Sequence, residues 1–270
     1  MGSYQGKALQ AREATRRGKR PWRVLVRALA LILAVGVLIH VPWSGLRRRF
    51  GVVTDVRVEG TRYLDAAQVA ERAEVRRGDD LFRLDLRRAR QRLLLDSRVA
   101  EAELGRRFAR GVRIRIRERV PALLVQHGTP WEIDSSGVLL QPLGRGVVAD
   151  VPMLVGPSLE GVAAGTQVSS PPVARGLAWS RALSEQVLQL AGQVSELDVS
   201  RADETGITLL DGTRVLGPAW PPSIRRLSAL RVVLADLKQK GTAAEEIDVR
   251  FENQVIVRPA ALPEGVGRNG

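Results

Sequence analysis

The feature that most constrains what this chain can fold into is a single apolar run, WRVLVRALALILAVGVLIHVPW, at residues 22–43. Its central 18 residues, 24–41, are interrupted only by Arg27 and His40. As a helix that rises about 1.5 Å per residue, they would be roughly 27 Å long, close to the bilayer hydrocarbon thickness of about 30 Å. The run therefore predicts a transmembrane helix over residues 22–43, with a tryptophan at each membrane interface.

The charge on the two sides of this run predicts its orientation. Residues 1–27 contain eight Lys or Arg, whereas the far flank contains three, at 47–49. Under the positive-inside rule we expect a basic cytoplasmic leader over residues 1–21, with the chain after the apolar run extracytoplasmic. A buried globular helix and a cleaved signal peptide are the alternatives. HVPWSG lacks an A-x-A-like cleavage site, which favours an uncleaved anchor in the lipid bilayer.

Net charge is a poor guide to the partners of this protein. The whole chain has a net charge of +13, but residues 1–49 contain 11 basic side chains against Glu13 alone, and residues 50–270 contain 31 basic and 28 acidic ones. The excess belongs to the N-terminal segment and does not indicate a nucleic-acid surface. The absence of cysteine excludes disulfides, thiolate catalysis and Cys-ligated zinc.

Residues 50–121 have the pattern of a small α+β unit, in which short runs of period two and period 3.6 alternate. Aspartates stand at the two places where helices would begin, as N-caps do. The predicted elements are, in order, a strand at 52–60, a helix after Asp65, a helix from about Asp85, and strands at 99–108 and 112–120.

This order resembles a POTRA domain. Two stretches carry the resemblance, VRVEGTRYLDAAQV at the start and RIRERVPALLV at the close. The second stretch is the more specific, because it contains the residues that end an alternating strand, Glu118-Arg119-Val120-Pro121-Ala122. The resemblance implies an interaction module, not an enzyme, over residues 50–121.

The last strand of this unit carries an arginine at every second residue. Because side chains alternate along a strand, Arg113, Arg115 and Arg117 share one side, which Arg119 extends. The side that we expect to be apolar carries Val112, Ile114, Ile116 and Val120. The arginines form either a solvated sheet face or an interaction face for an anionic partner. No stacking aromatics interleave with them, so nucleic acid is not the expected partner.

Residues 122–259 predict a mixed, mostly antiparallel β domain with two helices, so the fold class is α+β. Asp211-Gly212 between two apolar runs is the strongest hairpin signal, and Ser223 and Gly241 mark the ends of the second helix. The other expected elements are strands at 122–126, 131–133, 137–140 and 195–199, a loop at 142–172 and a helix at 173–191. Residues 260–270 have the composition of a disordered tail.

Catalytic patterns are scarce in this sequence. It contains no G-x-S-x-G, no Walker A, no S-x-x-K and no HExxH spacing. The histidines are His40, inside the apolar run, and His127, which has no nearby partner of a ligand-like spacing. We therefore expect no enzymatic activity, no cofactor, no metal and no small-molecule substrate.

The structured part of the chain closes with IDVRFENQVIVRP, residues 247–259. The stretch predicts two short strands around a turn at Glu252-Asn253. The expected core contacts of its first strand are Ile247, Val249 and Phe251. In its second strand, Val255 and Val257 should share one face and Ile256 and Arg258 the other, and the buried face would anchor the strand to the core. No later strand follows to cover it, so it predicts an open sheet edge that can accept a partner strand.

The layout of residues 22–259 resembles the bacterial cell-division family FtsQ, called DivIB in other lineages. The resemblance rests on the order of elements together with RERVPALLV and IDVRFENQVIVRP. It implies a single-pass inner-membrane scaffold of the divisome at the septum, which holds FtsB and FtsL in a ternary complex. It also implies that the protein links early and late division proteins to control septal wall synthesis.

The resemblance further implies where a partner binds. In the family, the last strands receive an extended segment of FtsB; on this sequence the edge corresponds to Arg250, Phe251, Asn253, Gln254, Val255, Ile256, Val257 and Arg258. Three alternatives remain beside this family: a transport-assembly POTRA protein, a generic membrane-anchored binding protein outside cell division, and an enzyme of cell-wall metabolism.

Overall fold

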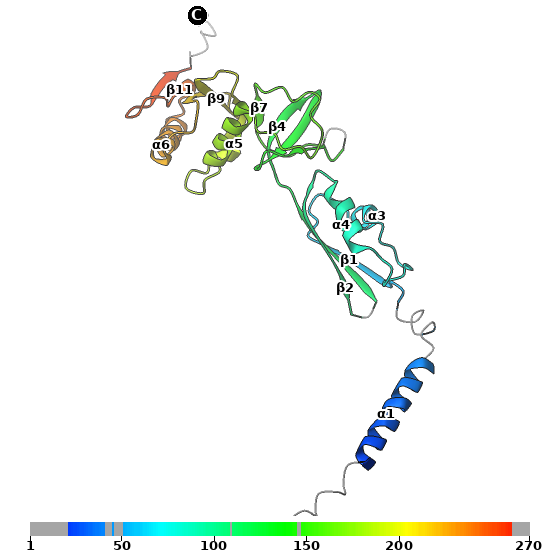
Figure 1. The fold of residues 1–270 in the computed structure, drawn as a ribbon. Helices are drawn as coiled ribbons and strands as arrows, with labels where there is room; N and C mark the ends of the chain where they lie inside the picture. The colour runs from blue at the N-terminus through cyan, green and yellow to red at the C-terminus, as the bar shows by residue number, and fades with distance from the viewer. Residues whose placement is uncertain (1–20, 41–44, 46–50, 109, 145–146, 261–270) are drawn as a thin grey trace, which may run out of the picture. The chain divides into compact units, whose positions relative to one another are not determined.

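A computed structural model of the chain describes residues 21–40, 45, 51–108, 110–144 and 147–260 (Figure 1). Most of the predicted leader at 1–21 and of the predicted tail at 260–270 therefore lies outside the described residues. The chain divides into two compact units, Met1–Val52 and Val53–Gly270, which are described separately below.

The first unit contains helix α1, Pro21–His40. Its apolar side chains are exposed, with Trp22 at 75% and Ile39 at 71%. Among the described residues, however, none of the helices combines the length and the apolar character needed to cross a membrane. The structure therefore contains a helix in the predicted transmembrane span, residues 22–43, and this helix ends at His40. Its ability to cross a bilayer is not shown. Residues 41–43 lie outside the described part of the chain.

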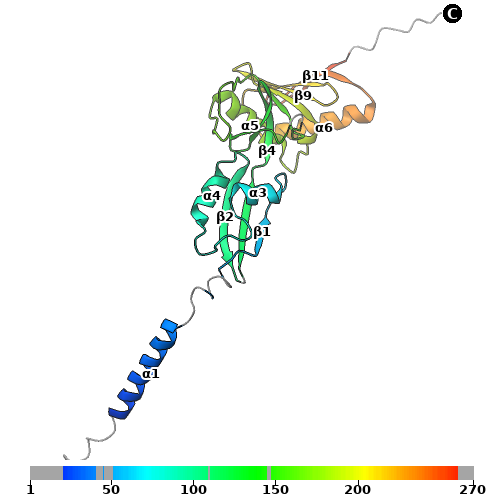
Figure 2. The same ribbon diagram turned by 90° about the vertical axis from the view of Figure 1, so that its right-hand side faces the viewer.

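The second unit begins with the predicted strand–helix–helix–strand–strand order, which the structure confirms. Strand β3 lies in the centre of a three-stranded sheet, parallel to β1 and antiparallel to β2. Helices α3 and α4 cover one face of this sheet (Figure 1 and Figure 2). The elements are β1 Asp55–Glu59, α3 Ala66–Arg72, α4 Leu86–Leu94, β2 Val99–Arg107 and β3 Gly111–Glu118.

Both helices of this first sheet begin at the predicted aspartates. The Asp65 carboxylate accepts a hydrogen bond from the backbone N–H of Ala67, and the Asp85 carboxylate accepts from those of Arg87 and Arg88, all at 3.0 Å. These bonds satisfy N–H groups that have no partner inside the helix. A local signal was therefore sufficient to predict where each helix starts.

The buried side of β3 contains a glutamate that the apolar pattern did not include, and the strand ends at it. Ile114 and Ile116 are buried as predicted, and Glu118 follows them on the same face. Its carboxylate accepts backbone hydrogen bonds from Arg62, Tyr63 and Leu64, at 2.7 to 3.1 Å. A buried carboxylate is tolerated here because three N–H donors replace its water. Val120, in contrast, is exposed; its predicted core position is wrong because the strand ends at Glu118.

The rest of the second unit is a nine-stranded mixed sheet in the order β12-β11-β10-β9-β8-β7-β4-β5-β6. Five of its eight strand pairs are antiparallel, which confirms the expected majority. The strands are β4 Pro121–His127, β5 Thr129–Asp134, β6 Leu139–Leu140, β7 Met153–Val155, β8 Val194–Asp198, β9 Glu204–Leu209, β10 Arg214–Pro218, β11 Ala244–Asp248 and β12 Ile256–Pro259. The helices are α5 Pro171–Leu183, α6 Ile224–Lys240 and the short 3-10 helix η1 Ala191–Gln193.

Two sequence-based boundaries are wrong. The expected loop at 142–172 contains β7, a three-residue strand that runs parallel to both β4 and β8 and was too short to give a periodic signal. Helix α5 ends at Leu183, not at residue 191. Leu188 and Leu190 are buried beyond its end, so their apolar character comes from tertiary burial and not from the helix.

The core of the second sheet is built around Trp179 of α5, which is fully buried and donates from Nε1 to the carbonyl of Ala219. The indole lies against Gly217 of β10, where an added Cβ would stand 2.6 Å from two ring carbons. Leu227 and Leu230 of α6 join the same apolar cluster. One glycine thus makes room for the largest core side chain.

The strongest local turn signals are confirmed. Gly212 has φ +88°, and the Asp211 carboxylate accepts from the Thr213 N–H at 2.9 Å, which closes the hairpin between β9 and β10. Gly241 ends α6 with φ +63°, in the left-handed conformation that favours glycine at a helix C-terminus.

Candidate interaction edge at the C-terminal strand

Strand β12 is one of the two outermost strands of the nine-stranded sheet. It pairs antiparallel with β11, and among the described residues no strand pairs with its other side. An edge strand presents backbone N–H and C=O groups that another chain can bind. Residues 261–270, which follow directly, lie outside the described part of the chain.

The register of β12 separates its side chains as predicted. Val257 pairs with Ile247 and packs against the core together with Val255. Ile256 lies on the opposite side of the strand and is 46% exposed. Arg258 is also exposed, and its guanidinium lies 3.5 Å from the Glu246 carboxylate of β11. The edge therefore offers one apolar and one charged side chain to a partner.

The connection before β12 differs from the predicted turn. Strand β11 ends at Asp248 and β12 begins at Ile256, so a seven-residue loop replaces a turn at Glu252-Asn253. The Asp248 carboxylate accepts from the Arg250 N–H at 2.9 Å, and this side-chain turn bends the chain out of the strand. Phe251 is consequently exposed, and its predicted core position is wrong.

The predicted partner residues thus divide between the loop and the strand. Only Ile256, Val257 and Arg258 lie in β12. The predicted residues that lie in the loop are Arg250, Phe251, Asn253, Gln254 and Val255.

Arg250 holds the loop to the body of the sheet. Its guanidinium contacts Asp248 at 2.6 Å and Glu204 of β9 at 2.8 Å. The hydrogen bonds from Arg250 lower the pKa of Asp248 below its usual value, and Asp248 in turn raises the pKa of Arg250. Arg250 therefore has an intramolecular role that the sequence pattern did not show.

A hollow of about 450 Å³ lies beside the loop, between it and the N-terminal end of α6. Arg226 of α6 donates to the carbonyl of Arg250 at 3.4 Å and lies 3.9 Å from the Glu252 carboxylate. The residues that line the hollow are Ser223, Arg225, Arg226, Ala229, Glu252, Asn253, Gln254 and Val255. The sequence did not indicate that α6 lies beside this loop, because the contact joins segments that are far apart in the chain.

The arginine face of β3 is neutralised by neighbouring strands. Arg113 and Arg115 lie 3.9 and 3.4 Å from the Glu59 carboxylate of β1. Arg117 hydrogen-bonds Glu101 of β2, which lowers the pKa of Glu101. A face that carries both signs of charge favours the solvated-sheet interpretation over an anion-binding surface.

The other sequence candidate, His127, has a structural environment. Its ring stacks on Trp131 with centroids 4.2 Å apart, and Nε2 lies 2.9 Å from the carbonyl oxygen of Val162. Within the described ranges, no group of three or more His, Cys, Asp or Glu side chains could hold a metal ion.

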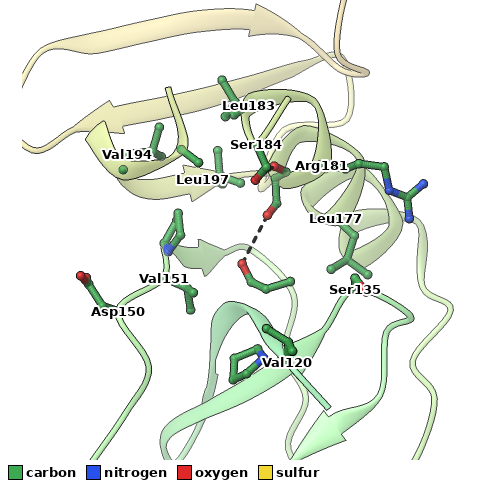
Figure 3. A pocket seen from close by; sticks show the side chains of 16 residues that line it. Val120, Ser135, Asp150, Val151, Leu177, Arg181, Leu183, Ser184, Val194 and Leu197 are labelled. Carbon is green, nitrogen blue, oxygen red and sulfur yellow. Dashed lines mark hydrogen bonds between the residues drawn. The ribbon is translucent and has the colours of Figure 1, made fainter. Parts of the chain in front are cut away.

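A second hollow, of about 410 Å³, lies between α5 and strands β4 and β8. Figure 3 shows mostly aliphatic side chains around it, with Asp150 and Arg181 on opposite sides. Inside it, Ser180 Oγ donates to the carbonyl of Ala122 at 3.3 Å. No pair of titratable side chains meets there, so the hollow is unsuited to acid–base chemistry.

Comparison with known proteins agrees with this architecture. Residues 52–119 match the family model described as "POTRA domain, FtsQ-type". The Cell division protein FtsQ of Rhodothermus marinus is 30% identical over 255 residues, which cover 89% of each chain. Those of Streptomyces coelicolor and Syntrophotalea carbinolica are 28% and 24% identical, over 78% and 88% of this chain and 80% and 87% of their own. The chain therefore belongs to the FtsQ family of cell division proteins.

Proposed function

We propose that this chain is a non-enzymatic scaffold of the divisome, and that it binds a partner protein by β-strand addition at β12. The observation that carries the proposal is the place of β12 at the edge of the sheet, where no described strand covers its outer side. A partner strand would satisfy the free backbone groups of the edge.

The side chains at this edge suit such a partner. Ile256 and Phe251 are large apolar groups that stay exposed in the free chain, and a partner would remove them from water. Arg258 is also exposed and pairs with Glu246 of β11, so the edge also carries a charge pair that can contribute to partner selection. Pro259 has no backbone N–H, so pairing is limited to a few residues of β12.

The partner class follows from the family resemblance. It points to FtsB- and FtsL-like proteins held in a ternary complex, and to a link between early and late division proteins that controls septal wall synthesis. The relatives named above are all cell division proteins, which favours this function over a binding or transport-assembly module outside cell division.

For its location we propose the inner membrane at the division septum. The segment around α1 would attach the chain to lipid, with the leader in the cytoplasm and the second unit outside. The basic leader and the exposed apolar side chains of α1 support this placement. Reporter fusions at the two ends of the chain would test it; a reporter at the C-terminus that is active only in the cytoplasm would contradict it.

The strand-addition proposal can be tested by site-specific photo-crosslinking in the full chain. A photoreactive residue at Ile256 should crosslink to an FtsB-like partner, whereas one at Leu210, which is 70% exposed at a different turn, should not. Val257→Pro should weaken capture of that partner because it removes an N–H on the open side of β12: the Ala260 N–H bonds Ala243 toward β11, and N–H direction alternates along the strand. Equal crosslinking at both positions, or normal capture by the folded Val257→Pro variant, would refute strand addition at β12.

A further inference from the structure

One end of the first sheet gathers side chains that the interaction edge does not use. Thr54 donates from its N–H to the carbonyl of Arg110 at 2.9 Å, so the tip of the β2–β3 hairpin lies beside the start of β1. The loop 78–84 is hydrogen-bonded to the same end of the sheet. The Val53 N–H donates to the backbone carbonyl of Asp79, and the Arg106 guanidinium donates to the carbonyls of Leu81 and Leu84. We call this region, residues 53–55, 78–84, 106–108 and 110–111, the hairpin end.

Two phenylalanines of the hairpin end point into solvent. Phe108, at the tip of the hairpin, is fully exposed at 104%, and Phe82, in the loop, is 57% exposed. Turn positions favour small and polar residues, and neither side chain contributes to the apolar core of this sheet. Exposed aromatic groups at two converging loops indicate a surface that becomes covered.

The charges around these aromatics are mostly positive. The arginines at or beside the hairpin end are Arg76, Arg77, Arg83, Arg106, Arg107 and Arg110, against Asp55, Asp79, Asp80 and Asp85. Three of these aspartates accept local backbone N–H bonds, Asp79 from Arg76, Asp80 from Phe82 and Asp85 from Arg87. Arg83 and Arg107 lie 3.8 Å from Asp80 and Asp55, respectively, and the balance of charge stays positive. Aromatic side chains set among arginines suit the interface of an anionic bilayer, where rings lie at the headgroups and guanidinium groups meet phosphate.

We infer that the hairpin end binds the surface of an anionic lipid bilayer, with Phe108 and Phe82 inserted among the headgroups. The inference rests on the proposed membrane attachment of the N-terminal segment. Only twelve residues, 41–52, separate His40 from Val53, and a fully extended chain of that length covers about 40 Å. The connection enters the second unit at Val53, which belongs to the hairpin end.

The full chain, reconstituted in liposomes, allows a direct test because it contains no cysteine. Phe108→Cys would carry a single fluorophore, and Leu210→Cys, at an exposed turn of the second sheet, is the matched control. With a quencher attached to the lipid chains, we expect several-fold stronger quenching at position 108 than at 210, and more in phosphatidylglycerol-containing vesicles than in phosphatidylcholine. Adding Arg107→Gln and Arg110→Gln should weaken this contact by roughly thirtyfold, since each juxtamembrane charge contributes about 1 kcal/mol and about 1.4 kcal/mol is a factor of ten.

The outcomes separate this inference from the attachment on which it rests. If the chain stays with the vesicles on flotation but the label at 108 is no more quenched than that at 210, the hairpin end does not bind lipid while the attachment stands. Protection of the label only after a protein partner is added would also overturn the inference. A chain that does not float with the vesicles would refute the attachment and the lipid contact together, and partner capture at β12 would remain a separate measurement.

Discussion

Arg98 and Glu132 form a buried ion pair between the first and second sheets: Nη2 of Arg98 lies 2.8 Å from Oε2 of Glu132, and the side chains are 5% and 1% exposed. Each partner makes a further bond, Arg98 to the carbonyl of Gln141 and Glu132 to the N–H of Ala149. Arg119, just after β3, forms a second link by donating to Asp134 of β5 at 2.8 Å. These contacts tie the last strands of the first sheet to β5 of the second.

Removal of one member of the buried pair should destabilise the protein strongly. Glu132→Ala leaves the Arg98 guanidinium buried without its counter-charge, and we expect a loss of about 3–5 kcal/mol in the free energy of unfolding, measured in urea. The double variant Arg98→Met, Glu132→Leu should lose much less, because no charge remains buried. A loss for Glu132→Ala no larger than that of the double variant would contradict the structural role of the pair.

The loop before β12 should loosen at low pH. The hydrogen bonds from Arg250 lower the pKa of Asp248 below its ordinary value of 3.8, so the stability they contribute is present above pH 3.8 and is lost as the pH falls through the lower folded value. Asp248→Asn should therefore flatten the acid limb of the stability–pH curve. Amide exchange of residues 249–255, followed from neutral to acid pH, is the measurement. Equal acid sensitivity of the variant and the natural chain would contradict this assignment.

The close approach of Trp179 to Gly217 predicts that Gly217→Ala is destabilising. The new methyl group would stand 2.6 Å from the indole, which is fully buried. Overpacking of this kind costs about 1–3 kcal/mol. Gly105→Ala is the matched control, since a Cβ there meets nothing within 4 Å. In thermal unfolding, Gly217→Ala should melt at a lower temperature than Gly105→Ala. Equal melting temperatures would contradict the prediction, because they would show that the core rearranges to accommodate the methyl group.

The arginine face of β3 should tolerate neutralisation. Its side chains are partly exposed and paired with Glu59, Glu101 and Glu103, and exposed ion pairs contribute little. We expect the triple variant Arg113→Gln, Arg115→Gln, Arg117→Gln to keep its melting temperature and the proposed localisation at the septum. Fluorescence microscopy of a tagged chain is the check. Loss of septal localisation in a folded variant would restore these arginines as an interaction face.

Several features of the fold were predictable because their causes are local. Asp65 and Asp85 start helices through bonds to N–H groups two or three residues away, and Asp211-Gly212 closes a hairpin through its own backbone geometry. Alternation predicted which side of β3 is buried and that Val255 and Val257 share one face of β12, which the structure places against the core. The candidate edge was predictable in part, since Ile256 and Arg258 share the opposite face as expected.

Other features depend on contacts between distant parts of the chain. Glu118 is buried because it receives three N–H groups from residues 62–64, and Arg250 leaves the strand pattern to reach Glu204. Arg175 of α5 is buried because the carbonyls of Val199 and Arg201 accept its hydrogen bonds. None of these partners can be identified from residue spacing.

The sequence by itself determined the kinds of elements, most of their starting points and the faces they bury, because caps, turns and side-chain periodicity act over a few residues. Only the tertiary structure decided the order of the strands, and with it that β7 fills the middle of the sheet while β12 is left at its edge. Strand order is chosen by burial and pairing between segments far apart in the chain. For that reason the sequence could suggest an edge open to a partner, but only the strand order of the folded protein shows β12 in the outermost position.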